Sequence, residues 1–339
     1  MQMIAIEVTS KFMHIVEGKI GSSGVAVKKA LSFPLPERSV RNGYIRQQDE
    51  LALVMNEAFL EHMLLKKTAS VEVDSRAIKT KRVEIPAEKR ERALMFLKKE
   101  MGSLISDEEY VLDYTIHRLF KKGKMPYMEC SVLAIPRELL TEYIGVFKGL
   151  GVKLSGIDVL DESLAKQFEM VCPSLKKANK AKAKNKKSKK NSEIFDEDME
   201  EEQASIEIKG PIKLWAGLYY EKIKLFTNGV DGSLFSRSVM LEGTGKSLEE
   251  IDEDKELITF YIEEIKKLIQ FQNEVSPNYP IGQIELFGEH QLINQICGLV
   301  SDSVKIPASR IQQPRQIKGV SQDEYARYMG AIGGLVRRK

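Results

Sequence analysis

The stretch from Met3 to Gly18 reads M-I-A-I-E-V-T-S-K-F-M-H-I-V-E-G, and the interpretation of the whole chain starts from it. Two short apolar runs flank three polar residues, Thr9, Ser10 and Lys11. Apolar runs of this length around a small polar turn are typical of a β-hairpin. Because Glu7 stands just before the turn, a carboxylate, two hydroxyl groups and an amine lie close in sequence. This turn is the first candidate binding site.

Composition indicates a globular protein of about two domains. The chain has 339 residues, of which 42% are hydrophobic and 30% charged, and such a length suggests roughly two domains. No apolar run approaches the length of about 20 residues that a membrane span needs. The first residues lack a basic region followed by a cleavage site, so we expect no signal peptide. Three widely spaced cysteines predict reduced thiols and a cytoplasmic protein, with no metal site.

A charged segment interrupts the chain and produces most of its net charge of +3. Nine lysines and no acid lie between positions 176 and 190, and seven acids and no base lie between 193 and 202. A segment this polar cannot bury enough apolar surface to fold, which predicts a disordered linker over residues 173–207. The remainder is almost neutral, so we expect no nucleic-acid partner.

Similar apolar patterns open both halves of the chain. After the first hairpin, positions 25–33 predict a third strand, and positions 212–220, 222–226 and 234–239 predict a second series of three strands. The intervening residues 78–156 alternate strands with two amphipathic helices and indicate a small α+β unit. Positions 325–336, rich in glycine and alanine, predict one final helix.

Several short landmarks carry a resemblance to a known family. In chain order they are Phe33-Pro34-Leu35-Pro36, Asn42-Gly43-Tyr44-Ile45, Arg82-Val83-Glu84-Ile85-Pro86, Val111-Leu112-Asp113-Tyr114, Leu133-Ala134-Ile135-Pro136 and Ile157-Asp158-Val159. They fall in the order seen in the PilM family of actin-like proteins of type IV pilus assembly, which are similar to the actin-like cell-division proteins.

The resemblance implies an α/β fold of the actin-like, ribonuclease-H-like duplicated type. Two domains would carry an α+β subdomain inserted into the first. On this view residues 1–77 and 157–172 form the first domain, 78–156 the inserted unit, 173–207 the linker and 208–339 the second domain.

The resemblance also implies a nucleotide site, but its motifs are altered. The degenerate site would comprise Glu7, Thr9, Ser10, Lys11, Gly217 and Gly288. Thr9 stands where a glycine would let the backbone close on a phosphate. Trp215 aligns with an acid of the second phosphate turn, and an indole cannot bind Mg²⁺ or accept a proton. Glu289 replaces the second glycine of the adenosine loop, which would close the space for a nucleoside.

Gly243-Thr244-Gly245-Lys246-Ser247 has the end of a P-loop but not its beginning. The motif requires a further glycine where Met240 stands. We therefore expect an ordinary turn at this place.

Two hypotheses follow from these features. The first is a probable pseudo-ATPase, without a required cofactor or metal, that acts as a scaffold at the inner face of the cell membrane. It would bind the cytoplasmic N-terminal tail of an inner-membrane pilus-assembly protein in a cleft beside the inserted unit, and connect that protein to the motor ATPases. The alternative is an active ATPase that binds ATP and Mg²⁺ in the pilus or cell-division machinery. Altered positions at Thr9, Trp215 and Glu289 favour the scaffold.

Overall fold

The structure is a computed structural model that describes residues 2–21, 24–65, 67–105, 109–171, 211–229, 234–241 and 253–336. The predicted linker over 173–207 and the turn at Gly243 to Ser247 lie outside these ranges. Within the described part, no helix has both the length and the apolar content that a membrane crossing requires.

The first domain is built on a six-stranded sheet of order β10-β6-β1-β2-β3-β16. Its strands are β1 (Gln2–Val8), β2 (Phe12–Gly21), β3 (Gly24–Pro34), β6 (Thr68–Val73), β10 (Lys153–Val159) and β16 (Ile317–Lys318). The first three form an antiparallel meander, while β1, β6 and β10 run parallel. A short ribbon of β4 (Val40–Arg41) and β5 (Tyr44–Ile45) leads into α1 (Gln48–Glu61).

The second domain repeats this topology. Its five-stranded sheet has the order β13-β12-β11-β14-β15, with an antiparallel meander followed by two parallel strands. The strands are β11 (Ile212–Tyr219), β12 (Lys222–Asn228), β13 (Leu234–Met240), β14 (Ile281–Gly288) and β15 (Ala308–Arg310). The helices α6 (Glu253–Val275) and α7 (Ile293–Val304) pack onto it. The predicted duplicated, actin-like α/β fold is therefore confirmed.

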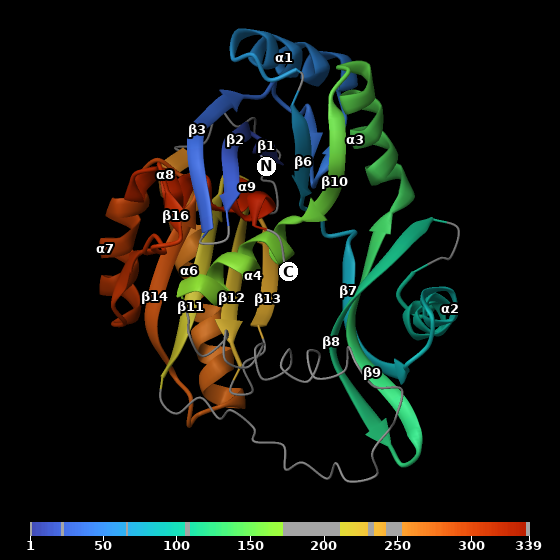
Figure 1. The fold of residues 1–339 in the computed structure, drawn as a ribbon. Helices are drawn as coiled ribbons and strands as arrows, with labels where there is room; N and C mark the ends of the chain where they lie inside the picture. The colour runs from blue at the N-terminus through green and yellow to red at the C-terminus, as the bar shows by residue number, and fades with distance from the viewer. Residues whose placement is uncertain are drawn as a thin grey trace.

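Helices α4 (Leu160–Val171) and α9 (Met329–Leu335) lie between the two sheets, as Figure 1 shows, and α8 (Gln322–Arg327) lies at the left, next to β16. Together with the facing strands they bury one continuous apolar cluster that draws on both domains. The two halves therefore share a core, and a pair of sheets joined in this way behaves as one packed body.

The final helix predicted over 325–336 is two helices, α8 and α9, with the break at Tyr328. Tyr328 packs edge-on against the ring of His14 and accepts a hydrogen bond from the Ser32 hydroxyl (3.2 Å). These contacts hold Tyr328 against β2 and β3, and the chain changes direction there.

The inserted unit stands apart on the right of Figure 1. It consists of a three-stranded antiparallel sheet of order β7-β9-β8 with α2 (Arg90–Met101) on one face. The strands are β7 (Lys79–Pro86), β8 (Tyr110–Lys122) and β9 (Met125–Pro136). Helix α3 (Arg137–Gly149), which the sequence boundaries 78–156 assign to this unit, instead buries its apolar face in the first domain. The observed packing therefore ends the unit near residue 136.

Candidate functional site

The first turn, between β1 and β2, is closed by its own side chain. Thr9 Oγ1 accepts the backbone N–H groups of Phe12 (2.9 Å) and Lys11 (3.3 Å). The N–H of Thr9 donates in turn to the carbonyl oxygen of Phe12 (2.9 Å). Backbone N–H groups are what such a turn offers to a phosphate, and here two of them are directed at a hydroxyl of the protein.

Glu289 extends from the end of β14 into this first turn. Its carboxylate accepts the hydroxyl of Thr9 (2.8 Å) and the N–H of Tyr220 (3.3 Å), and it lies 3.3 Å from Nε2 of His14. Only 3% of Glu289 is exposed. The segment expected to surround an adenosine therefore contacts the segment expected to hold its phosphates, with no space between the two.

Gly288 makes this approach of Glu289 possible. Its φ of +114° lies in the region that favours glycine, and a Cβ there would lie 2.5 Å from the carbonyl oxygen of Leu218. Gly288 therefore turns the chain after β14, and its contacts are with protein backbone.

Glu7 is buried and its two carboxylate oxygens are both satisfied. The Tyr219 hydroxyl donates to Oε1 (3.1 Å), and the N–H of Ala331 donates to Oε2 (3.2 Å). Helix α9 passes directly over the carboxylate at Gly330, where a Cβ would lie 2.4 Å from Oε2. Burial raises the pKa of Glu7 above its usual value. A metal ion could reach this carboxylate only after α9 and Tyr219 had moved.

Ser10 and Lys11 also face the second domain. The Ser10 hydroxyl hydrogen-bonds the carboxylate of Glu221, and the Lys11 ammonium lies 4.0 Å above the centre of the Tyr220 ring. A cation over an aromatic face is attracted by the ring's quadrupole. The structure therefore brings Glu7, Thr9, Ser10 and Lys11 together, but at a contact between the two domains, which we call the junction.

Gly217 and Trp215 do not lie in the second turn, so the interpretation that placed Trp215 there is wrong. The turn is formed by Tyr220 and Glu221, whereas both residues are interior positions of β11. Trp215 is fully buried, stacked on Phe168 with ring centroids 4.6 Å apart, and its indole N–H donates to Glu285 (2.8 Å). A Cβ on Gly217 would lie 2.7 Å from the ring of Phe287. Both residues build the shared apolar core.

The sequence did not identify two lysines of the junction. Lys222 and Lys224 lie on β12 and bind Asp74 and Asp161 of the first domain. The alternation of lysine with isoleucine and leucine in K-I-K-L-F is the signal that could have drawn attention to them. By itself that pattern equally describes a strand with a solvent-facing side.

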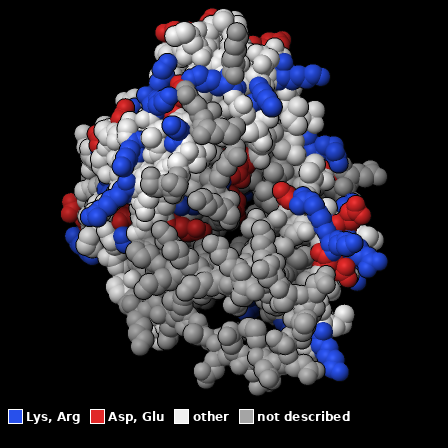
Figure 2. All heavy atoms as spheres, in the orientation of Figure 1, with Lys and Arg blue, Asp and Glu red and all other residues white. Residues whose placement is uncertain are grey.

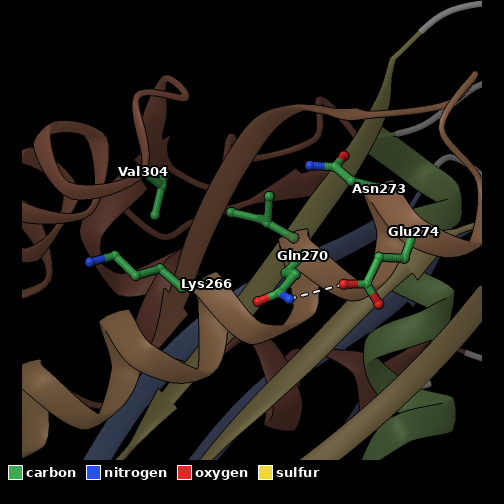
Figure 3. A pocket seen from close by; sticks show the side chains of 6 residues that line it. Lys266, Gln270, Asn273, Glu274 and Val304 are labelled. Atoms are coloured by element: carbon green, nitrogen blue, oxygen red, sulfur yellow. Dashed lines mark hydrogen bonds between the residues drawn. The ribbon is translucent and has the colours of Figure 1, made fainter.

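A cavity of about 380 Å³ lies away from the junction, on the outside of the second domain. Figure 3 shows its lining residues, which come from α6 and the end of α7. Within it the Gln270 amide donates to Glu274 (2.9 Å). None of the residues assigned to the nucleotide site lines this cavity.

The residues at the junction do not fit a nucleotide with its metal ion. The Glu7 carboxylate is covered by α9, the turn N–H groups are bonded to Thr9, and Glu289 fills the adenosine side. Among the residues that the structure describes, no three His, Cys, Asp or Glu side chains converge as ligands of a metal ion. The junction is arranged to hold protein against protein.

Comparison with solved structures supports the fold. The structure of a PilM–PilN type IV pilus biogenesis complex contains a chain that matches 99% of this one over 97% of its own length, with a TM-score of 0.71 and 15% sequence identity. A protein of actin-like ATPase fold and unknown function from Bacteroides thetaiotaomicron matches more loosely, with a TM-score of 0.47 and 11% identity over 98% of this chain and 95% of its own. No family model matches the chain, and no curated protein matches it. The resemblance to PilM is thus confirmed at the level of the fold.

Proposed function

We propose that this chain is a scaffold of type IV pilus assembly that binds the cytoplasmic N-terminal tail of an inner-membrane assembly protein and does not turn over ATP. Through that partner it would lie at the inner face of the cell membrane, and it would connect the partner to the motor ATPases. The observation that carries the proposal is the closed junction, where the groups expected to bind a nucleotide bind one another.

The fold supports the pilus-assembly part of the proposal. This chain follows a chain of a PilM–PilN type IV pilus biogenesis complex over nearly its whole length. The inserted unit is part of that match, and in the family the cleft beside this unit is the expected site for a partner's tail.

A surface suited to an extended tail lies where the first domain meets the inserted unit. The pKa of Tyr44 is raised by burial and by the nearby charge of Glu138, with smaller contributions from Tyr110 and Glu142, so these side chains lie together. Tyrosine offers an apolar ring with a polar end, which suits peptide contacts. Arg46 of the chain itself lies over the Tyr44 ring (5.0 Å to its centre), and Glu142 accepts the N–H of Ile45 (2.8 Å). Exposed Glu138 is then the carboxylate that a lysine or an arginine of the tail would pair with.

The long strand β8 begins at this surface. It is an outer strand of the inserted sheet, so one of its edges pairs with no other strand among the described residues. An extended peptide can add to such an edge through main-chain hydrogen bonds, while side-chain pockets provide specificity. The tail would then run from the tyrosines along β8.

On the face of the molecule that Figure 2 shows, positive and negative side chains lie among one another. Figure 2 shows Lys and Arg interspersed with Asp and Glu over the domains and the inserted unit. Such mixing favours contacts defined by local shape and pairing over long-range attraction to a polyanion.

Calorimetry with synthetic tails of candidate inner-membrane assembly proteins tests the binding surface. Tyr110→Ala should weaken the tail affinity by about tenfold, because buried tyrosines carry much of the energy at interfaces. Tyr279→Ala, just before β14 in the second domain and away from the inserted unit, is the matched control and should bind as wild type. Equal affinities for the two variants would remove this surface from the proposal.

The absence of turnover has its own test. Purified protein with ATP and Mg²⁺ should release phosphate no faster than buffer. Hydrolysis that is clearly above this background and is abolished by Glu7→Gln would establish the alternative, an active ATPase.

A further inference from the structure

Two lysines of the second domain project into the first domain at the junction. Lys222 and Lys224 are two residues apart on β12, so their side chains share one face of the sheet. Side-chain exposure is 6% for Lys222 and 2% for Lys224. Lysines are almost never buried to this degree unless they are paired, so their partners define what they do.

All the close partners on the first-domain side are carboxylates. Lys222 Nζ lies 2.8 Å from Oδ2 of Asp74, and Lys224 Nζ lies 2.9 Å from Oδ1 of the same residue. Lys224 Nζ also lies 2.5 Å from Oδ1 of Asp161. Asp74 follows the end of β6, and Asp161 is in the first turn of α4. One carboxylate thus bridges both ammonium groups, and one ammonium group bridges two elements of the first domain.

The charges at this contact depend on each other. Burial alone would raise the pKa of Asp74, but the two lysines outweigh it and hold that pKa well below its usual range. Burial would likewise lower the pKa of Lys224, and the carboxylates of Asp161 and Asp74 outweigh it and raise that pKa. Asp74 and Lys224 therefore stay charged, and separating the domains would leave each of them without its partner.

The next residue on the same face of β12 shows that the lysines belong to the domain contact. Phe226 enters the apolar cluster shared by both domains, whereas Ile223 and Leu225, on the other face, enter the core of the second domain. The face of β12 that contacts the first domain is thus charged near the turn, at Lys222 and Lys224, and apolar further along the strand, at Phe226. A buried ion pair adds little net stability compared with apolar packing, but it fixes geometry strongly, because every displaced charge loses its partner.

We propose that Lys222 and Lys224 form an internal cationic clamp that keeps the two domains closed without a bound nucleotide or metal ion. Their ammonium groups supply positive charge between carboxylates of the first domain, at the junction where an actin-like molecule would hold its ligand. The relative position of the domains is then set by the chain itself. The inference goes beyond scaffold function, because it assigns how the closed arrangement is maintained.

Amide hydrogen exchange on the full chain, together with small-angle scattering, tests the clamp. In the Lys222→Met, Lys224→Met double variant we expect the amides of both junction turns to exchange at least about tenfold faster, and the radius of gyration to increase. Lys213→Met is the matched control, since Lys213 pairs with Glu285 inside the second domain (2.8 Å) and should leave both readings unchanged. The proposal would be overturned if the double variant had the amide exchange rates and the radius of gyration of the wild type.

A single-residue comparison covers the case in which the double variant does not fold. Lys224→Arg retains the cation and should keep slow exchange in both turns, whereas Lys224→Gln removes the charge at similar length and should not. Equal protection in these two variants would also overturn the clamp. Tail binding measured on the same preparations separates the two proposals, because a clamp that fails this test while the tail still binds leaves the scaffold function intact.

Discussion

Replacing Glu72 with glutamine should change how the stability of this protein depends on pH. Glu72 lies in β6 beside Glu7 of β1, and 1% of it is exposed. Helix α9 passes over its carboxyl group at Gly334, where there is no room for a side chain. Burial raises the pKa of Glu72 to about 8, the charge of Asp158 adds to this, and a hydrogen bond from Ser163 opposes it.

The magnitude follows from the two pKa values. The unfolded chain loses this proton near pH 4.5, whereas the folded protein keeps it until about pH 8. Proton binding therefore stabilises the folded state fully below the lower value, and that stabilisation is lost as the pH rises towards the higher one. At about 1.36 kcal/mol per pH unit, the wild type should lose about 3 to 4 kcal/mol of unfolding free energy between pH 5 and pH 8 through this group.

Urea unfolding at pH 5 and at pH 8 measures the effect. The fluorescence of Trp215, the single tryptophan, reports the transition. Glutamine has no titrating proton, so Glu72→Gln should gain about 3 to 4 kcal/mol relative to wild type on going from pH 5 to pH 8. Glu50→Gln, on the exposed side of α1, is the control and should follow the wild type. A difference between Glu72→Gln and wild type that is the same at both pH values would refute the reasoning.

Three further substitutions probe packing: one at the junction, one in α7 as its control and one in the shared apolar core. Gly330→Ala places a methyl group 2.4 Å from the Glu7 carboxylate and should cost about 1 to 3 kcal/mol of unfolding free energy. In contrast, Gly298→Ala should be neutral or stabilise the protein by up to about 1 kcal/mol, because α7 has open space there. Thermal unfolding of both alanine variants measures the difference, and equal changes in the two would contradict the prediction. Trp215→Phe removes the indole donor of buried Glu285 and should cost about 1 to 3 kcal/mol of unfolding free energy. Because this variant has no tryptophan, its urea unfolding is followed by circular dichroism; no change would mean that the hydrogen bond contributes nothing.

The duplicated sheets could be predicted because their signals are local. Short apolar runs, tight polar turns and amphipathic helices each depend on neighbours in sequence, and they occur in the same order in both halves. The boundary of the inserted unit was harder to predict from the sequence. Helix α3 follows β9 without a break, and only the packing of Leu139, Tyr143 and Phe147 shows that it belongs to the first domain.

The chemistry of the junction was predictable only in part. The turn residues at positions 7 and 9–11, which the sequence singled out as a candidate site, do meet the second domain. That they form a nucleotide site stays a prediction. The lysines were not predictable, because Lys224 and Asp74 are 150 residues apart in sequence. Strand β12 reads as half-exposed, yet every one of its residues is buried. A strand's polar face looks the same in sequence whether water or a partner domain covers it.

The buried polar groups of the junction depend on one another for their hydrogen bonds. The hydroxyl of Thr9 donates to Glu289, so a glycine at position 9 would leave a buried carboxylate short of a donor. Removing Glu289 would leave that hydroxyl the carbonyl oxygen of Phe12 (3.1 Å) as its acceptor, and would remove an acceptor of the Tyr220 N–H. Glu7, in turn, reaches both Tyr219 and the backbone of α9. Any single substitution among these residues thus removes a hydrogen-bond partner from a buried polar group, and this interdependence keeps the junction closed.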